Sequence, residues 1–220
     1  MRAWIALLLA FGLVFAGVSQ ASVTAKYDYT RWTYTPSGTT TVDVEGGNIS
    51  EVNVTAVTLT DRWAGVFGNV TGTITLQAAG DTTYLYQWTW DGTGYICFTQ
   101  DTAFDFAAAT AATAADVDNA FGFPTTVSDS ATNTLTTTQN LDLSVVSITG
   151  AAAATHMSGS AYYTAAIKDT TSPTEGDLAF CTQLRLGNGY KGVPVDYELM
   201  LPTTYGPSGL EVYYIFLDLS

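Results

Sequence analysis

The sequence contains few charged residues and very few basic ones. Asp, Glu, Lys and Arg together make up 12% of the 220 residues, with 7 basic and 20 acidic residues. Nucleic acids and anionic lipid surfaces are bound through clusters of Lys and Arg. The composition therefore argues against both as partners, whereas its acidity suits a solvated extracellular surface.

Histidine and cysteine are equally scarce. His156 is the only histidine, and Cys97 and Cys181 are the only cysteines. This set is too small and too widely spaced for a zinc site, and His156 has no nucleophile motif such as Gly-x-Ser-x-Gly beside it. We therefore expect no metal, no cofactor and no enzyme activity.

Acidic residues can support chemistry without histidine, but none is singled out by its context. Paired carboxylates hydrolyse glycosides, yet nothing distinguishes Asp101, Asp105 or Glu175 for that role, so a secreted glycosidase is a distant third hypothesis. Three other acids have the oxygen ligands that calcium prefers: Asp116, Asp118 and Asp129. No EF-hand loop surrounds them, and solvated surface carboxylates are the simpler interpretation.

The N-terminus is typical of a secretory signal peptide. Arg2 precedes an apolar stretch at residues 3–18, and small residues follow at Ser19 and Ala21. The stretch is shorter than the roughly 20 apolar residues that a spanning helix needs, which predicts a signal peptide at residues 1–21. An uncleaved anchor is the alternative. We expect a secreted or cell-surface protein without stable membrane insertion, whose residues 22–220 carry a formal charge of about −14.

Export also bears on the two cysteines. Both lie in apolar, strand-like sequence, and an oxidising compartment favours their pairing. The sequence therefore predicts a disulfide between Cys97 and Cys181, with two separate buried thiols as the alternative. Three N-glycosylation sequons suit the same location, at Asn48, Asn53 and Asn69.

Strand patterns dominate the rest of the chain. Apolar and polar residues alternate over short segments that are separated by Gly, Pro, Asn and Asp, as at residues 70–77. One short helix is expected near residues 113–121, with Thr113 and Asp116 as its capping box and Gly122 as its C-terminal cap. No repeat or linker divides residues 22–220, which are predicted to form an all-β fold, a single jelly-roll-like β-sandwich.

Four aromatic residues occupy alternate positions of one expected strand: Tyr84, Tyr86, Trp88 and Trp90. Aromatic residues on one strand face commonly fill the core of a sandwich. If this face is exposed instead, it would stack on sugar rings, as in carbohydrate-binding modules, and surface glycans would be its partners.

The glycine-rich segment after Trp63 carries a resemblance to other proteins. Residues 63–72 contain three glycines, and the motifs Asp-Val-Asp at 116–118 and Phe-Gly-Phe at 121–123 follow. These segments resemble those of secreted β-rich archaeal surface proteins of unassigned role. The resemblance implies a location at an archaeal cell surface and brings no catalytic residue with it.

The two ends of the exported chain suggest how copies would associate. Residues 210–217 are apolar on both phases, which predicts a central strand buried on both faces. Residues 22–34 directly follow the expected cleavage site and form either a strand of their own domain or one donated to a neighbour's sheet edge. The donated face would carry Val23, Ala25, Tyr27 and Tyr29. In arrangement, the chain resembles strand-donating filament subunits of the biofilm-fibre and archaeal bundling-pilin types.

Together these features predict a structural subunit of an extracellular filament or surface coat, which self-assembles through β-strand addition. The alternative is a secreted carbohydrate-binding module that uses the aromatic strand face. Exposure of Trp88 and Trp90 distinguishes the two hypotheses, since a sugar-binding platform must be in contact with solvent.

Overall fold

The computed structural model describes residues 59–80, 82–156, 162–204 and 210–219, which from Asp61 onward belong to one compact unit. The expected signal peptide, the segment at residues 22–34 and the sequons at Asn48 and Asn53 lie outside the described residues.

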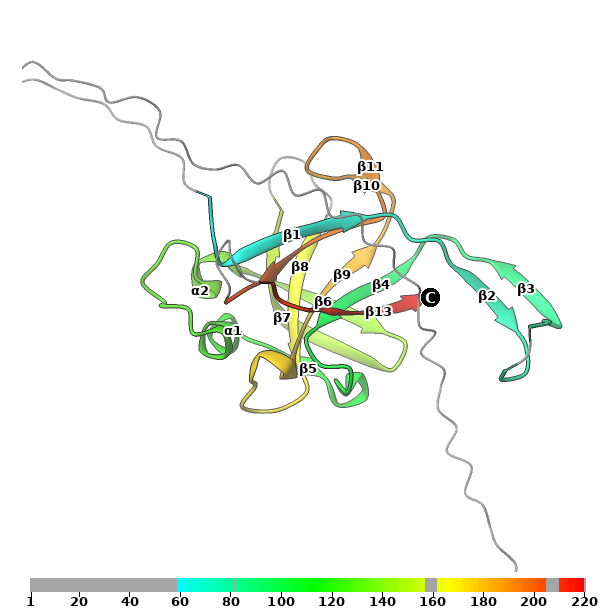
Figure 1. The fold of residues 1–220 in the computed structure, drawn as a ribbon, viewed down its shortest axis with the longest axis horizontal. Coiled ribbons are helices and arrows are strands. Elements are labelled where there is room, and N and C mark those ends of the chain that lie inside the picture. Colours follow the sequence, from blue (N-terminus) through cyan, green and yellow to red (C-terminus); the bar gives the residue numbers. More distant parts are fainter. Residues whose placement is uncertain (1–58, 81, 157–161, 205–209, 220) are drawn as a thin grey trace, which may run out of the picture. The chain divides into compact units, whose positions relative to one another are not determined.

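A seven-stranded antiparallel sheet forms the centre of the fold, in the order β13-β4-β9-β8-β7-β6, with β5 paired to β8 (Figure 1). The predicted all-β class is thereby confirmed. The middle strands β4 and β9 are buried along nearly their whole length, in keeping with their mostly apolar sequences. The strands of this sheet are β4 (Gly94–Thr99), β5 (Thr110–Ala111), β6 (Thr137–Leu143), β7 (Val146–Thr155), β8 (Tyr163–Lys168), β9 (Leu178–Leu184) and β13 (Tyr214–Leu219).

A two-stranded sheet packs on one face of this large sheet. It consists of β1 (Trp63–Gly68) and β12 (Tyr197–Pro202), which pair antiparallel. Leu199 and Leu201 of β12 join Phe98, Phe180 and Leu184 of the large sheet in one buried apolar cluster. This is sheet-on-sheet packing of the sandwich kind, with only two strands in the second layer among the described residues.

The opposite face of the large sheet is covered because the sheet curls over itself. The backbone N–H of Asp142 in β6 donates to the Tyr95 hydroxyl of β4 at 3.3 Å, and that of Ser144 donates to the Asp218 carboxylate of β13 at 2.7 Å. The β6–β7 hairpin therefore returns from one edge of the sheet to the other. Small residues allow this close approach: Ala151, Ala153, Ala165 and Ala179 are fully buried in this second cluster.

The helix expected near residues 113–121 is confirmed as α1 (Ala114–Phe121), and a single turn, α2 (Ala131–Thr134), follows it. Thr113 and Asp116 form the capping box, and Gly122 is the left-handed C-terminal cap. The buried Asp118 carboxylate accepts the backbone N–H groups of Ala131 and Thr132 at 2.6 and 2.9 Å, which fixes α2 against α1. Two 3-10 turns, at Phe106–Ala108 and Glu175–Asp177, complete the helical structure that is described.

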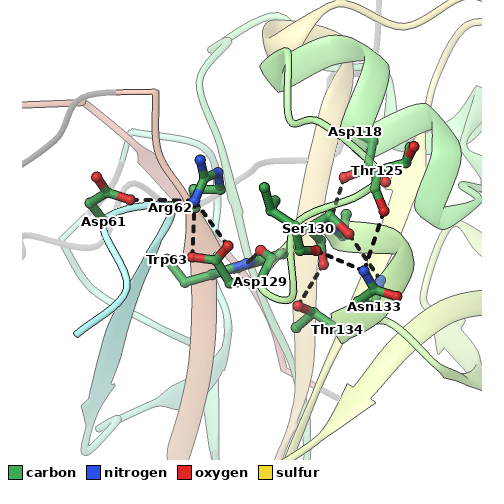
Figure 2. Close-up of polar contacts among 11 residues, drawn as sticks. Asp61, Arg62, Trp63, Asp118, Thr125, Asp129, Ser130, Asn133 and Thr134 are labelled. Atoms are coloured by element: carbon green, nitrogen blue, oxygen red, sulfur yellow. Dashed lines mark hydrogen bonds and ion pairs between the residues drawn. The ribbon is translucent and has the colours of Figure 1, made fainter. Parts of the chain in front are cut away.

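An ion pair fixes the start of β1, where the described chain enters the sheet (Figure 2). The Arg62 guanidinium donates to both carboxylate oxygens of Asp129 at 2.9 and 3.1 Å, and the Trp63 indole donates to the Asp129 carbonyl at 2.8 Å. Asn133 holds the same loop, because its side-chain amide donates to the Val127 carbonyl at 2.7 Å. The first described strand is therefore tied to the loop between α1 and α2.

Two hairpins have no third strand among the described residues. One consists of β2 (Thr73–Leu76) and β3 (Tyr86–Thr89), and is called the arm below. The other, β10 (Gly187–Asn188) and β11 (Pro194–Val195), is a short turn before β12 (Figure 1).

Candidate functional site: an open sheet edge and an exposed arm

The C-terminal strand β13 lies at an edge of the large sheet and pairs with β4 alone among the described residues. The predicted strand at residues 210–217 is wrong in its bounds, since β13 (Tyr214–Leu219) begins four residues later, and among the described residues β13 is an edge strand and not a central one. Leu210 and Val212 are exposed and precede the strand. An apolar pattern on both phases fits a central strand, but it fits equally well an edge strand that is completed from outside the described unit.

Both faces of β13 are apolar and incompletely covered. Ile215, Leu217 and Leu219 pack against the cluster shared with β12, whereas Phe216 points to the opposite cluster, with its ring 5.0 Å from that of Phe106. Tyr214 is exposed, and every other residue of the strand is only partly buried. The strand thus offers apolar surface on both faces and, along its free side, backbone groups for a further strand.

The arm has one apolar and one polar face. Its cross-strand pairs Ile74–Trp88 and Leu76–Tyr86 share one face, and the pairs Thr73–Thr89 and Thr75–Gln87 share the other. The apolar face is exposed, with exposed fractions of 37% for Ile74, 50% for Leu76, 57% for Tyr86 and 45% for Trp88.

The interpretation that the aromatic series fills the core is wrong for Tyr84, Tyr86 and Trp88, which are all exposed. Trp90 alone is partly buried and packs against the cluster shared with β12. Its indole donates to the Thr93 carbonyl at 2.7 Å, which fixes the base of the arm.

Two kinds of predicted site that suit an exported protein lie in the described part of the chain. Cys97 and Cys181 form a disulfide between directly opposite positions of β4 and β9. Asn69, the one sequon residue within the described part, is exposed immediately after β1 and is therefore accessible to a glycosylating enzyme.

His156 belongs to a buried polar cluster that sequence reasoning missed. Its Nδ1 lies 2.9 Å from the Glu198 carboxylate, and its Nε2 lies 3.0 Å from the Thr164 hydroxyl. With Glu198 ionised, Nδ1–H donates to the carboxylate and Nε2 accepts the hydroxyl proton. Burial lowers the pKa of His156 below its usual 6.5, although Glu198 acts in the opposite direction.

A hydroxyl, an imidazole and a carboxylate in this order have the connectivity of a nucleophile triad. Thr164, however, is fully buried, and its hydroxyl also accepts the backbone N–H of Met200 at 2.7 Å. Because no substrate carbonyl reaches a fully buried oxygen that is already bonded on both sides, the cluster joins β8 to β12 and does not form a nucleophilic site.

A second place that the sequence did not single out is an open hollow of about 460 Å³ beside the turn at Glu175–Asp177. Burial, and secondarily the nearby Glu211, raise the pKa of Glu175. Glu175 is the one carboxyl group among the residues that line the hollow, which also include Gln100 and Asn119. A glycosidase needs two carboxyl groups facing one substrate, so this hollow lacks that arrangement.

The three acids considered for calcium have protein partners. Asp116 pairs with Lys168 at 2.8 Å, Asp118 holds α2, and Asp129 binds Arg62. Within the described ranges, no three His, Cys, Asp or Glu side chains come together as a metal site would require. No helix in those ranges is long and apolar enough to cross a bilayer.

Comparison with protein families, with curated proteins and with solved structures gave no match. The resemblance to secreted archaeal surface proteins and to strand-donating subunits therefore stays a prediction.

Proposed function

We propose that the protein is a structural subunit of an extracellular filament or surface coat, in which copies associate by β-strand addition. The observation that carries this proposal is β13, an edge strand that is apolar on both faces and only partly covered. A strand added along its free side would satisfy its backbone groups and cover its side chains at once.

The opposite edge of the same sheet supports this argument by contrast. Natural proteins protect exposed edges with polar residues and β-bulges. β6 has both, since Thr137, Thr138 and Asn140 are exposed and its pairing with β7 shifts register between Gln139 and Leu141. β13 has neither a register shift in its pairing with β4 nor a Lys or Pro, and its single charged residue, Asp218, is bonded to Ser144.

The segment at residues 22–34 is the proposed donor. It alternates Val23, Ala25, Tyr27 and Tyr29 with polar residues and contains two basic residues and one acidic residue. Residues 61–219 contain 16 acidic and 4 basic residues, so donor and acceptor have opposite net charge. The intervening residues 35–58 span at most about 80 Å when fully extended, which is long enough to reach a neighbouring copy.

Export is part of the same proposal. Removal of residues 1–21 would free Ser22 and the donor segment only after translocation, which would keep copies from assembling inside the cell. The disulfide and the accessible sequon at Asn69 suit an oxidising, glycosylating compartment.

The test compares two double variants of the exported chain, residues 22–220. Tyr27→Lys with Tyr29→Lys charges the donor face, whereas Thr24→Lys with Thr30→Lys adds the same charge on the opposite phase. Electron microscopy and sedimentation velocity should show polymers for the wild type and the control, and none for the Tyr variant. A wild type that stays monomeric at high concentration refutes the proposal.

The same variants detect the competing arrangement, in which residues 22–34 complete their own domain. In that case the Tyr variant lowers the urea midpoint of unfolding while the wild type remains monomeric. Circular dichroism and the urea midpoint of each variant therefore accompany the sedimentation data.

A carbohydrate-binding module is the second candidate, and it is favoured by the exposure of Tyr84, Tyr86 and Trp88, of which Tyr86 and Trp88 share one face of the arm. Stacking on a sugar ring is an interaction of the aromatic face, so Trp88→Ala should reduce retention by immobilised polysaccharide. Retention that is absent in the wild type, or unchanged by the substitution, excludes this function.

A further inference from the structure

The arm presents apolar surface that its own domain leaves uncovered. Its strands β2 and β3 pair with each other and with no other strand among the described residues. A two-stranded hairpin is at best marginally stable in water unless one face packs on another layer. Because Ile74, Leu76, Tyr86 and Trp88 are all exposed on the same face, that layer must come from outside the described unit.

We propose that the apolar face of the arm packs against the same face of the arm of a second copy. This contact adds to the proposed strand addition at β13 and does not depend on it. Two ribbons packed face to face lie about 10 Å apart and interdigitate their side chains, as the layers of a β-sandwich do. A two-fold contact is self-complementary and closes after two copies, so the arm produces pairs.

The distribution of charge is the first reason to propose that a second copy covers the apolar face of the arm. Residues 63–90 contain a single charged residue, Asp81, in a chain that has 20 acidic and 7 basic residues. Two copies of an acidic protein repel each other, and the repulsion is weakest where their uncharged segments meet. The arm, which is nearly free of charge, is therefore suited to contact another copy of this acidic chain.

The geometry of the face also favours a protein partner over a sugar. The rings of Tyr86 and Trp88 lie 4.8 Å apart at an interplanar angle of 60°, which is not a flat platform. The Thr and Gln side chains of the arm lie on the opposite face, so the apolar face has few groups to bind sugar hydroxyls. Aliphatic Ile74 and Leu76 sit opposite the aromatic rings, as in a sandwich core.

An open hollow of about 530 Å³ at the end of the arm extends the apolar face. Leu76, Tyr84 and Leu85 line it together with Gln77, Ala78 and Thr83. A hollow beside the apolar ribbon accommodates a large side chain of the partner arm, which is how buried anchors stabilise protein interfaces.

The experiment uses the exported chain with the donor face blocked by Tyr27→Lys and Tyr29→Lys, so that any association left is independent of strand addition. Leu76→Lys is added in one variant and Thr75→Lys in the other. Both place one positive charge on β2, but on opposite faces of the arm. Analytical ultracentrifugation gives the dimerisation constant, and circular dichroism and the urea midpoint confirm that each variant is folded.

We expect the donor-blocked chain to dimerise, Leu76→Lys to weaken dimerisation at least about tenfold, and Thr75→Lys to leave it nearly unchanged. A donor-blocked chain that is monomeric at all concentrations overturns the proposal, as do equal effects of the two lysines. If the donor-blocked chain forms no dimer but is retained by immobilised polysaccharide, and Leu76→Lys abolishes this retention, the apolar face of the arm binds sugar instead.

The outcomes separate this contact from strand addition in the unblocked chain. If the wild type forms dimers but no polymers, the arm contact is supported and strand addition is refuted. If the wild type forms polymers and the donor-blocked chain is monomeric, strand addition is supported and the arm contact is refuted.

Discussion

Removal of the disulfide should cost the fold a large part of its stability. Cys97 and Cys181 are directly opposite on the two middle strands of the sheet and are 84 residues apart in sequence. In the chain-entropy model, closing a loop of this length stabilises the folded state by up to about 4–5 kcal/mol. Since a domain of this kind is stable by about 5–15 kcal/mol in total, the loss is a substantial fraction.

The measurement is urea unfolding of Cys97→Ala with Cys181→Ala against the oxidised wild type. Alanine avoids burying a new hydroxyl, because both positions are buried. The reduced wild type is the matched control, since it lacks the bond but keeps both sulfur atoms, and it separates the effect of the bond from that of the cavity. Reduction of the folded protein should be as slow as its unfolding, because a reductant cannot reach the buried Cys181 otherwise.

Two results would refute this reasoning. A loss below about 1 kcal/mol would mean that the bond adds little to a structure already formed in the reduced chain. Mass spectrometry that finds two alkylated thiols in the non-reduced protein would remove the bond altogether.

Two further predictions concern single side chains. Thr113→Ala should cost roughly 1 kcal/mol in urea unfolding, because it removes the side-chain cap of α1, and Thr113→Ser should restore most of it; a loss of only a few tenths would contradict this. His156 should make stability depend on pH: burial lowers its pKa below 6.5, so its contribution is complete above pH 6.5 and is lost as the pH falls through the lower folded-state pKa. The urea midpoint of unfolding should therefore decrease as the pH falls below 6.5 in the wild type, and should depend less on pH in His156→Gln. The same pH dependence of the midpoint in both proteins would exclude the effect.

Features that depend on neighbours in sequence could be predicted from the sequence. The helix begins after Thr113 and ends at Gly122, because a capping box and a left-handed cap involve residues within one or two turns. The all-β class likewise follows from local alternation. The cysteine pairing was predictable for a different reason, since two cysteines allow one intramolecular disulfide.

Features that depend on distant strands could not be predicted. Alternation shows that the two faces of residues 73–89 differ, but not whether any other layer covers the apolar one. For β13, an apolar pattern on both phases is compatible with either one or two strand neighbours, and the number is decided by segments far away in the chain. The role of Asp118 could not be predicted either, because its partners, the N–H groups of α2, lie 13 and 14 residues further along the chain.

The His156 cluster illustrates the same limit at a candidate site. Thr164 and Glu198 are 8 and 42 residues away from His156, and no motif connects them. Only the pairing of β7 with β8, and the packing of β12 against β8, bring the three side chains together. The presence of a histidine, a threonine and a glutamate in a sequence does not by itself indicate a triad.

The two proposed surfaces meet at the base of the arm, where two glycines permit a close approach. A Cβ on Gly72 would lie 2.7 Å from the Leu219 side chain of β13 and 3.0 Å from the Trp90 ring. Gly94, at the start of β4, has a φ of 128° and lies so close to the Asp218 carbonyl that a Cβ there would overlap it. Glycine is therefore required at both positions, because the end of β13 lies this close to the base of the arm and to the start of β4.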